Sequence, residues 1–166
     1  ARWQEDVIDL RPDVLSVFVG TNDAERHLGR LLRADDPKTV PDFDFADWER
    51  TYRGLLDQAR QANPALKIVL CTPFAAPCGK IVEGALGEYY PLRQRILAQC
   101  CVIVERIAAD YGATLVPFHR LIADLETRLP NGDATYWVWD GIHPTPAGQR
   151  LMADCWIGAA ARSGVM

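Results

Sequence analysis

The stretch VLSVFVGTND, residues 14–23, decides the fold class of this chain. Its first six residues are rich in β-branched and aromatic side chains and are followed by a glycine, which is typical of a strand buried on both faces. Residues 67–71 (KIVLC) and 113–116 (ATLV) repeat this pattern, and prolines follow both of them closely. The sequence therefore predicts three short strands of the kind found in parallel sheets.

Helical patterns separate these strands. Apolar residues recur at helical spacing in two segments. The first contains Trp48, Tyr52, Leu55, Leu56 and Ala59, and the second contains Leu92, Ile96, Cys100, Ile103, Ile107 and Tyr111. A last helix is predicted after His143, with Thr145 as its N-cap and Pro146 in the first helical position. Its inner face would carry Leu151, Met152, Cys155 and Trp156. Residues 2–10 are predicted to be the end of another helix.

Strands that alternate with long helices form βαβ units, so the predicted class is α/β, a parallel sheet with helices on both faces. Three strands are few for such a sheet, and its edges need cover, so we expect further elements upstream of residue 1. Residues 1–166 are predicted to form one domain that is incomplete at its N-terminus. Two stretches, 24–46 and 73–88, are predicted to be irregular, and both follow carboxyl ends of strands, where ligands bind in such sheets.

Composition narrows the function classes. Hydrophobic residues make up 49% of the 166 residues and charged residues 24%, which excludes a disordered chain, and no apolar run is long enough to cross a bilayer. The net charge of −4, without a basic cluster, predicts no nucleic-acid partner and favours small neutral substrates. Five cysteines without a C-x-x-C pair indicate neither a disulfide framework nor a zinc site, and favour a cytoplasmic location. An incomplete sheet is also compatible with a homo-oligomer.

Two polar motifs lie at the predicted ligand-binding edge: GTND at residues 20–23 and DGIHP at residues 140–144. An aspartate three residues before a histidine on a turn can accept the imidazole Nδ1–H, which leaves Nε2 free to remove a proton from a nucleophile. Asn22 offers a neutral NH₂ donor that can stabilise an oxyanion. Structural interpretations stay open for each: Asp140 as a turn residue, His143 as a surface or capping residue, and Asn22 as a strand terminator.

Together these motifs resemble those of the SGNH (GDSL-type) hydrolases, which are esterases and acylhydrolases with a flavodoxin-like three-layer α/β/α fold. Residues 20–23 are similar to the family's G-x-N-D block, and residues 140–144 resemble its D-x-x-H-P block. The resemblance implies that Asn22 is an oxyanion-hole donor, His143 the general base and acid, and Asp140 its orienting partner. It also implies a small-molecule or carbohydrate ester as substrate, with no metal and no organic cofactor.

Two further residues are predicted to contact the substrate. Gly20 opens the first motif, although a sharp backbone turn explains this glycine as simply. Trp139 directly precedes Asp140, and it either lines an acyl or sugar pocket or packs in the core.

The family's G-D-S block, which carries the nucleophilic serine, has no counterpart in this sequence. The chain contains two serines, Ser16 and Ser163, and neither stands in a Gly-Asp-Ser context. The resemblance therefore implies that the attacking serine lies upstream of residue 1. Cys71 and Cys78 are not expected to replace it, because no nearby base is indicated by their spacing. Two alternatives remain: a catalytically inactive fragment, and a flavodoxin-like binding module.

Overall fold

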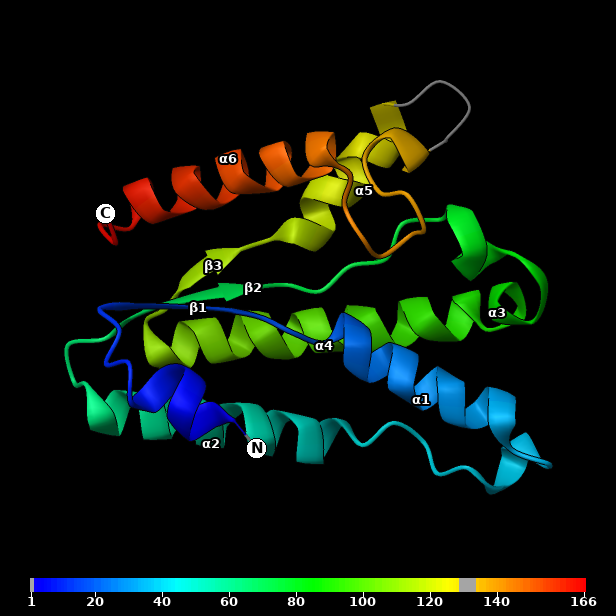
Figure 1. Ribbon diagram of the computed structural model, residues 1–166, viewed down its shortest axis with the longest axis horizontal. Coiled ribbons are helices and arrows are strands. Elements are labelled where there is room, and N and C mark those ends of the chain that lie inside the picture. Colours follow the sequence, from blue (N-terminus) through cyan, green and yellow to red (C-terminus); the bar gives the residue numbers. More distant parts are fainter. Residues whose placement is uncertain (1, 129–133) are drawn as a thin grey trace.

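The computed structural model describes residues 2–128 and 134–166, and within them three strands form a parallel sheet in the order β1-β2-β3 (Figure 1). The strands are β1 (Val14–Phe18), β2 (Lys67–Cys71) and β3 (Thr114–Val116). Val17 pairs with Leu70, and Leu70 pairs in turn with Leu115. The three predicted strands are thus confirmed within one residue at either end.

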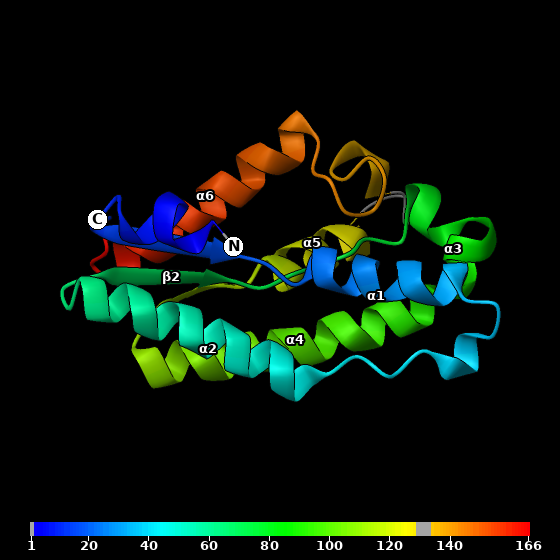
Figure 2. The same cartoon turned by 60° about the horizontal axis from the view of Figure 1, so that its bottom comes forward.

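Helices cover both faces of this sheet, which confirms the predicted three-layer α/β/α fold (Figure 2). One face is covered by α2 (Phe45–Ala62) and α4 (Tyr90–Tyr111), and the other by α5 (Phe118–Arg128) and α6 (Pro146–Arg162). The chain enters through a short helical segment, η1 (Gln4–Ile8), which packs beside α2. The predicted helix over residues 2–10 is therefore present in shorter form.

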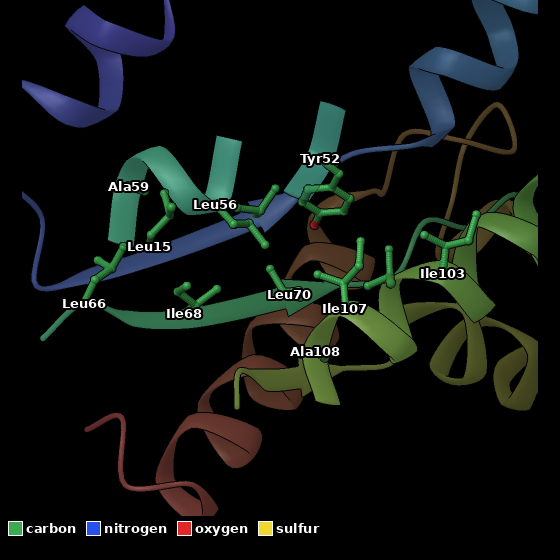
Figure 3. Packing of buried hydrophobic residues seen from close by; sticks show 12 residues of the cluster. Leu15, Tyr52, Leu56, Ala59, Leu66, Ile68, Leu70, Ile103, Ile107 and Ala108 are labelled. Atoms are coloured by element: carbon green, nitrogen blue, oxygen red, sulfur yellow. The ribbon is translucent and has the colours of Figure 1, made fainter. Parts of the chain in front are cut away.

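The hydrophobic core is divided between the two faces because side chains alternate along each strand. Ile68 and Leu70 of β2 point toward α2 and α4, where they meet Leu56 and Ile107 (Figure 3). Val69 and Cys71 point to the opposite face, toward α5 and α6. These four side chains of β2 are buried, as expected for the central strand of a parallel sheet, and Lys67 at its start is exposed.

The predicted irregular stretch 24–46 is wrong in its first part. Helix α1 (Thr21–Arg33) follows β1 directly and extends beyond the carboxyl end of the sheet (Figure 1). Ala24, Leu28 and Leu31 lie on its buried side. Their spacing of four and three residues is the helical signal, but the polar residues between them obscure it. The rest of the stretch contains only η2 (Pro37–Thr39) before α2 begins.

The other irregular stretch, 73–88, has a long extended segment followed by two short helices, η3 (Gly79–Val82) and α3 (Gly84–Glu88). After α5, and beyond the residues that are not described, η5 (Ala134–Tyr136) leads into the loop before α6. The start of α6 is as predicted: the Thr145 hydroxyl accepts a hydrogen bond from the Gly148 N–H at 3.1 Å, and Pro146 occupies the first turn. Within the described residues, no helix combines the length and the apolar character that a membrane span requires.

Candidate active site

The two sequence motifs lie beyond the carboxyl ends of the strands, as predicted. Gly20 ends the segment that leaves β1 and precedes the first turn of α1, with a φ of 121° that L side chains rarely adopt. It is buried, and a Cβ at this position would lie 2.8 Å from Cγ of Pro73. The backbone of Gly20 therefore requires a glycine for its turn and for the close approach of Pro73. A substrate contact by this residue stays a prediction.

The DGIHP motif lies in a tight loop between η5 and α6. Its two ends are held together because the Trp139 N–H donates to the His143 carbonyl at 3.1 Å, and the Thr145 N–H donates to the Trp137 carbonyl at 2.9 Å. The Thr145 hydroxyl also donates to the Tyr136 carbonyl at 2.7 Å. The loop is thus closed by its own backbone, which presents residues 140–143 at its tip.

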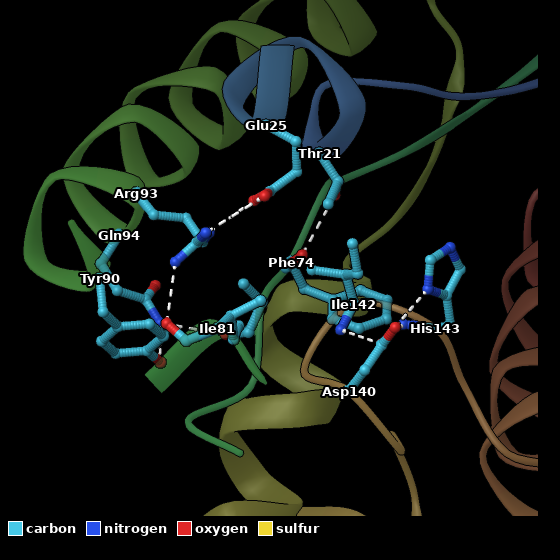
Figure 4. A network of polar contacts seen from close by, with 11 residues as sticks. Thr21, Glu25, Phe74, Ile81, Tyr90, Arg93, Gln94, Asp140, Ile142 and His143 are labelled. Carbon is cyan, nitrogen blue, oxygen red and sulfur yellow. Dashed lines mark hydrogen bonds and ion pairs between the residues drawn. The ribbon is translucent and has the colours of Figure 1, made fainter. Parts of the chain in front are cut away.

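Asp140 and His143 form a hydrogen-bonded pair at this tip (Figure 4). Asp140 Oδ2 lies 2.8 Å from His143 Nδ1. The other carboxylate oxygen, Oδ1, accepts the backbone N–H groups of Ile142 at 3.1 Å and His143 at 2.9 Å. Within the described part of the chain, Nε2 of His143 has no hydrogen-bond partner, and the side chain is 66% exposed. The geometry therefore fixes the ring through Nδ1 and leaves Nε2 accessible to a reactant.

The environment keeps Asp140 ionised. Partial burial by itself would raise the pKa of this carboxyl group, and it is the largest single influence. The hydrogen bonds from the His143 side chain and from two backbone N–H groups, together with the His143 charge, outweigh it and hold the pKa below its ordinary value of 3.8. Asp140 is consequently a carboxylate at neutral pH, able to orient an imidazole and stabilise an imidazolium.

Gly141 allows the loop to lie close to the rest of the protein. Its φ is 92°, and a Cβ at this position would overlap the side chain of Ile81 and lie 2.7 Å from the Cys78 carbonyl oxygen. The Gly141 carbonyl in turn accepts the Ala76 N–H at 2.8 Å. The segment between β2 and α3 is thus the surface on which the Asp140–His143 loop rests.

We expect Gly141→Ala to lower the free energy of unfolding by about 1–3 kcal/mol, because the new methyl group imposes backbone strain and overlaps Ile81. Urea denaturation of the complete protein measures this loss. Gly54→Ala is the matched control: Gly54 lies inside α2 with nothing within 4 Å of an added Cβ, so the change should stabilise the helix by up to about 1 kcal/mol. Equal stability of the two variants would contradict the described loop.

Asn22 lies in the first turn of α1 and is exposed. It therefore belongs to the helix that follows β1, and not to the end of the strand. A short series of contacts connects this turn to the loop. The Thr21 hydroxyl donates to the Phe74 carbonyl at 3.1 Å, and two residues further on Ala76 bonds to Gly141. Ala24 and Ile142 also pack in one hydrophobic cluster. Helix α1 therefore brings its N-terminal end, where anionic groups are stabilised, to the side of the loop.

Asp23, the last residue of the first motif, makes a structural contact, whereas two aromatic residues just before the second motif are exposed. The Asp23 carboxylate accepts the indole N–H of Trp48 at 3.1 Å, which connects α1 to α2. Trp139, by contrast, is 62% exposed, and so is Tyr136 at 66%. The core interpretation of Trp139 is therefore wrong, because the loop turns this side chain toward solvent next to Asp140. A contact of Trp139 with the substrate stays a prediction.

A second histidine, His119, has neighbours like those of a catalytic triad, but its hydroxyl partner is buried. His119 Nδ1 lies 2.7 Å from the Thr72 hydroxyl, and His119 Nε2 lies 3.9 Å from the Glu105 carboxylate. Thr72 is completely buried, however, and its oxygen also accepts the His119 backbone N–H. Burial lowers the pKa of His119 more than Glu105 raises it, and Glu105 is paired with Arg120 at 2.6 Å. This group stabilises the start of α5.

The two serines, and the cysteines Cys71 and Cys78, are engaged by groups other than the His143 side chain. Ser16 lies within β1 and accepts the Trp156 indole N–H. Ser163 bonds to Thr114 at the start of β3, which is the end of the strand opposite to the carboxyl edge where the site lies. Burial raises the pKa of the Cys71 thiol to about 11, so it stays protonated at neutral pH. Cys78 is buried, and its thiol donates to the Val138 carbonyl at 3.0 Å.

Metal ligands are not clustered at this site. Among residues 2–128 and 134–166, no group of three or more His, Cys, Asp or Glu side chains could hold a metal ion. The arrangement itself holds an imidazole with an orienting carboxylate, beside a helix N-terminus and the amide side chain of Asn22.

A parallel sheet between two helical layers, with a carboxylate–imidazole pair beyond its carboxyl edge, defines a three-layer α/β/α protein with a candidate site at that edge. The family model for GDSL-like lipases and acylhydrolases matches residues 1–151, and the chain belongs to the GDSL-like Lipase/Acylhydrolase family. The family resemblance expected from residues 20–23 and 140–144 is thereby confirmed.

Individual relatives agree with this assignment. The chain is 31% identical over 160 residues to an acetylxylan esterase from Geobacillus stearothermophilus, covering 95% of this chain and 63% of that protein. A solved structure described as a GDSL-like lipase from Parabacteroides merdae superimposes with a TM-score of 0.78 at 28% identity, covering 96% of this chain and 65% of that one. The chain therefore spans less than two thirds of the length of these relatives.

A third comparison concerns a catalytic mutant of the G. stearothermophilus acetylxylan esterase Axe2, in which a serine is replaced by alanine. That structure matches with a TM-score of 0.71 at 26% identity, covering 95% of this chain and 64% of that one. Its description identifies a serine as catalytic in that esterase.

Proposed function

We propose that the complete protein hydrolyses carboxylic esters by a Ser-His-Asp mechanism, with His143 and Asp140 as two members of the triad. The observation that carries this proposal is the Asp140–His143 pair itself, with its 2.8 Å contact through Nδ1 and an exposed ring. Family membership and the similarity to an acetylxylan esterase support ester hydrolysis as the reaction.

The nucleophile in this proposal is a serine that precedes residue 1. Two observations support it: the two serines of this chain are engaged elsewhere, and a serine is catalytic in the related acetylxylan esterase. His143 Nε2 removes the proton from the serine hydroxyl as the oxygen attacks the ester carbonyl, and Asp140 stabilises the imidazolium that results. His143 then returns the proton to the leaving alcohol, and water releases the acyl group in the same manner.

The oxyanion of the tetrahedral intermediate is held in this proposal by the side-chain NH₂ of Asn22 and by backbone N–H groups. The position of Asn22 supports this role, because it is exposed in the first turn of α1 and the helix dipole favours negative charge there. No metal or organic cofactor takes part.

As the substrate class we propose an acylated carbohydrate or a similarly small ester. Two exposed aromatic side chains precede the Asp140–His143 pair closely in sequence: Tyr136 ends η5, and Trp139 lies in the same loop as the pair. Aromatic faces of this kind bind the apolar faces of sugars and small acyl groups, and the related enzyme is an acetylxylan esterase.

The proposal is tested on the complete gene product with p-nitrophenyl acetate and acetylated xylooligosaccharides as substrates. A serine-directed fluorophosphonate should abolish turnover and add one adduct to the intact mass, on a serine upstream of residue 1. Hydrolysis of neither substrate, together with no adduct, would contradict the proposal and favour an inactive fold or a binding module. An adduct on Ser16 or Ser163 would refute the placement of the nucleophile.

Asn22→Ala tests the oxyanion role separately. We expect kcat to fall by about 10²–10³-fold with little change in KM, because the donor acts on charge that develops only in the transition state. Steady-state kinetics on p-nitrophenyl acetate measure both constants. The matched control is Arg26→Ala, whose side chain is 73% exposed in the next turn of α1, and which should keep kcat within twofold. A rise in KM alone would assign Asn22 to ground-state binding instead.

A further inference from the structure

Arg93 of α4 is a charged residue buried within the protein. Its side chain is 0% exposed, and burying a cation is unfavourable unless its hydrogen bonds and its charge are satisfied. Arg93 Nε lies 2.5 Å from Glu25 Oε1, and Nη2 lies 3.1 Å from Glu25 Oε2 (Figure 4). A third donor, Nη1, bonds to the Ile81 carbonyl at 3.1 Å. One guanidinium therefore connects three separate segments of the chain.

Each partner of Arg93 adjoins one half of the candidate active site. Glu25 lies on α1 three residues after Asn22, so the two residues share one turn of that helix. Ile81 belongs to η3, and its side chain lies directly against Gly141. Gly141 is the residue between Asp140 and Ile142 in the chain. The Arg93 side chain thus holds the helix that presents Asn22 and the surface that supports the Asp140–His143 loop.

We propose that Arg93 is a positioning residue, which fixes the separation between Asn22 and the Asp140–His143 pair. This inference rests on the proposed function, because it assigns to those residues the two sides of one reaction centre. Arg93 touches neither the substrate nor the reacting atoms. It acts by setting where α1 lies relative to η3 and to the loop that η3 supports.

The geometry requires an arginine in this position. The planar fork places two N–H groups on the two oxygens of Glu25 and directs the third to a carbonyl in another segment. A lysine supplies the charge from a single nitrogen and cannot maintain this planar arrangement. Replacement by lysine therefore retains the charge but loosens the connection between α1 and η3.

Three variants of the complete protein test this role: Arg93→Lys, Glu25→Gln and, as control, Ile107→Ala. Ile107 is buried in the same helix but packs against the sheet, away from the loop, so its replacement lowers Tm without touching the connection. We expect Arg93→Lys to lower kcat by about 10–100-fold with KM changed less than threefold, because small displacements of catalytic groups have effects of this size. Ile107→Ala should keep kcat within twofold well below its Tm.

A spectroscopic measurement separates this inference from the proposed function. In ¹H–¹⁵N spectra, Arg93→Lys should shift the backbone amide resonances of both Asn22 and Gly141, whereas Ile107→Ala should leave both in place. If the complete protein hydrolyses no ester, the proposed function fails and these resonances alone decide the positioning role. If Arg93→Lys does not fold, Glu25→Gln, which keeps the shape of the pair, provides the same test. Unshifted Asn22 and Gly141 resonances, or an unchanged kcat in a folded variant, would overturn the inference.

Discussion

Replacement of His143 by alanine is expected to lower the ester turnover of the complete protein by at least about 10³-fold. In the proposed mechanism, His143 supplies the exposed ring nitrogen that takes the proton from the nucleophile and later delivers it to the leaving alcohol. Its side chain is 66% exposed and contacts the protein mainly through Asp140, so the variant should fold normally. The effect should therefore appear in kcat, measured with p-nitrophenyl acetate, while Tm stays close to that of the parent.

His119→Gln is the matched control for this experiment. His119 contacts a threonine hydroxyl at 2.7 Å and a glutamate at 3.9 Å, so on distances alone it resembles a catalytic histidine. Because its threonine partner is buried, we expect His119→Gln to lower Tm but to keep kcat within a few-fold. If His143→Ala retained nearly full activity, the assignment of the general base would be wrong.

Asp140→Asn is expected to lower kcat by about 10³–10⁴-fold, a loss comparable with that of the triad aspartate in serine proteases. In the parent, Oδ1 accepts two backbone N–H groups and Oδ2 accepts the imidazole Nδ1–H. An asparagine can keep the backbone bonds through its carbonyl oxygen, but it then presents an NH₂ group to Nδ1. This donor selects the tautomer with the proton on Nε2, which cannot act as the base.

The same variant should also change the acid dependence of stability. The pKa of Asp140 is lowered in the folded protein, so its contribution to stability is present above its ordinary value of 3.8 and is lost as the pH falls through the lower folded value. Urea denaturation between pH 2 and pH 5 should show a smaller loss of stability for Asp140→Asn than for the parent. Asp154→Asn is the control, since Asp154 is exposed on α6, where it pairs with Arg150 at 3.1 Å and not with His143. Equal turnover by Asp140→Asn and the parent would remove Asp140 from the mechanism.

The parts of the fold that could be predicted are those whose signals are local. The segment KIVLC is predicted to be a buried strand because the four apolar residues after Lys67 suit a strand between two helical layers, and β2 has the predicted bounds. The cap at Thr145 and the pair Asp140–His143 join residues three positions apart, so spacing alone indicated them. Helix α1 was not predicted, because its buried residues are few and charged residues lie between them. The spacing of Ala24, Leu28 and Leu31 is nevertheless helical.

The sequence by itself determined the strands, most of the long helices and the contact between Asp140 and His143, because each depends on residues that are neighbours along the chain. Tertiary structure alone decided how these parts form one site. The ion pair between Glu25 and Arg93 joins residues 68 positions apart, and the Thr72–His119 contact joins residues 47 apart. No local pattern encodes such contacts, because they exist only after the sheet has placed α1, α4 and the loops at its carboxyl edge. For the same reason only the fold could show that Trp139 faces solvent and that His119 faces a buried hydroxyl.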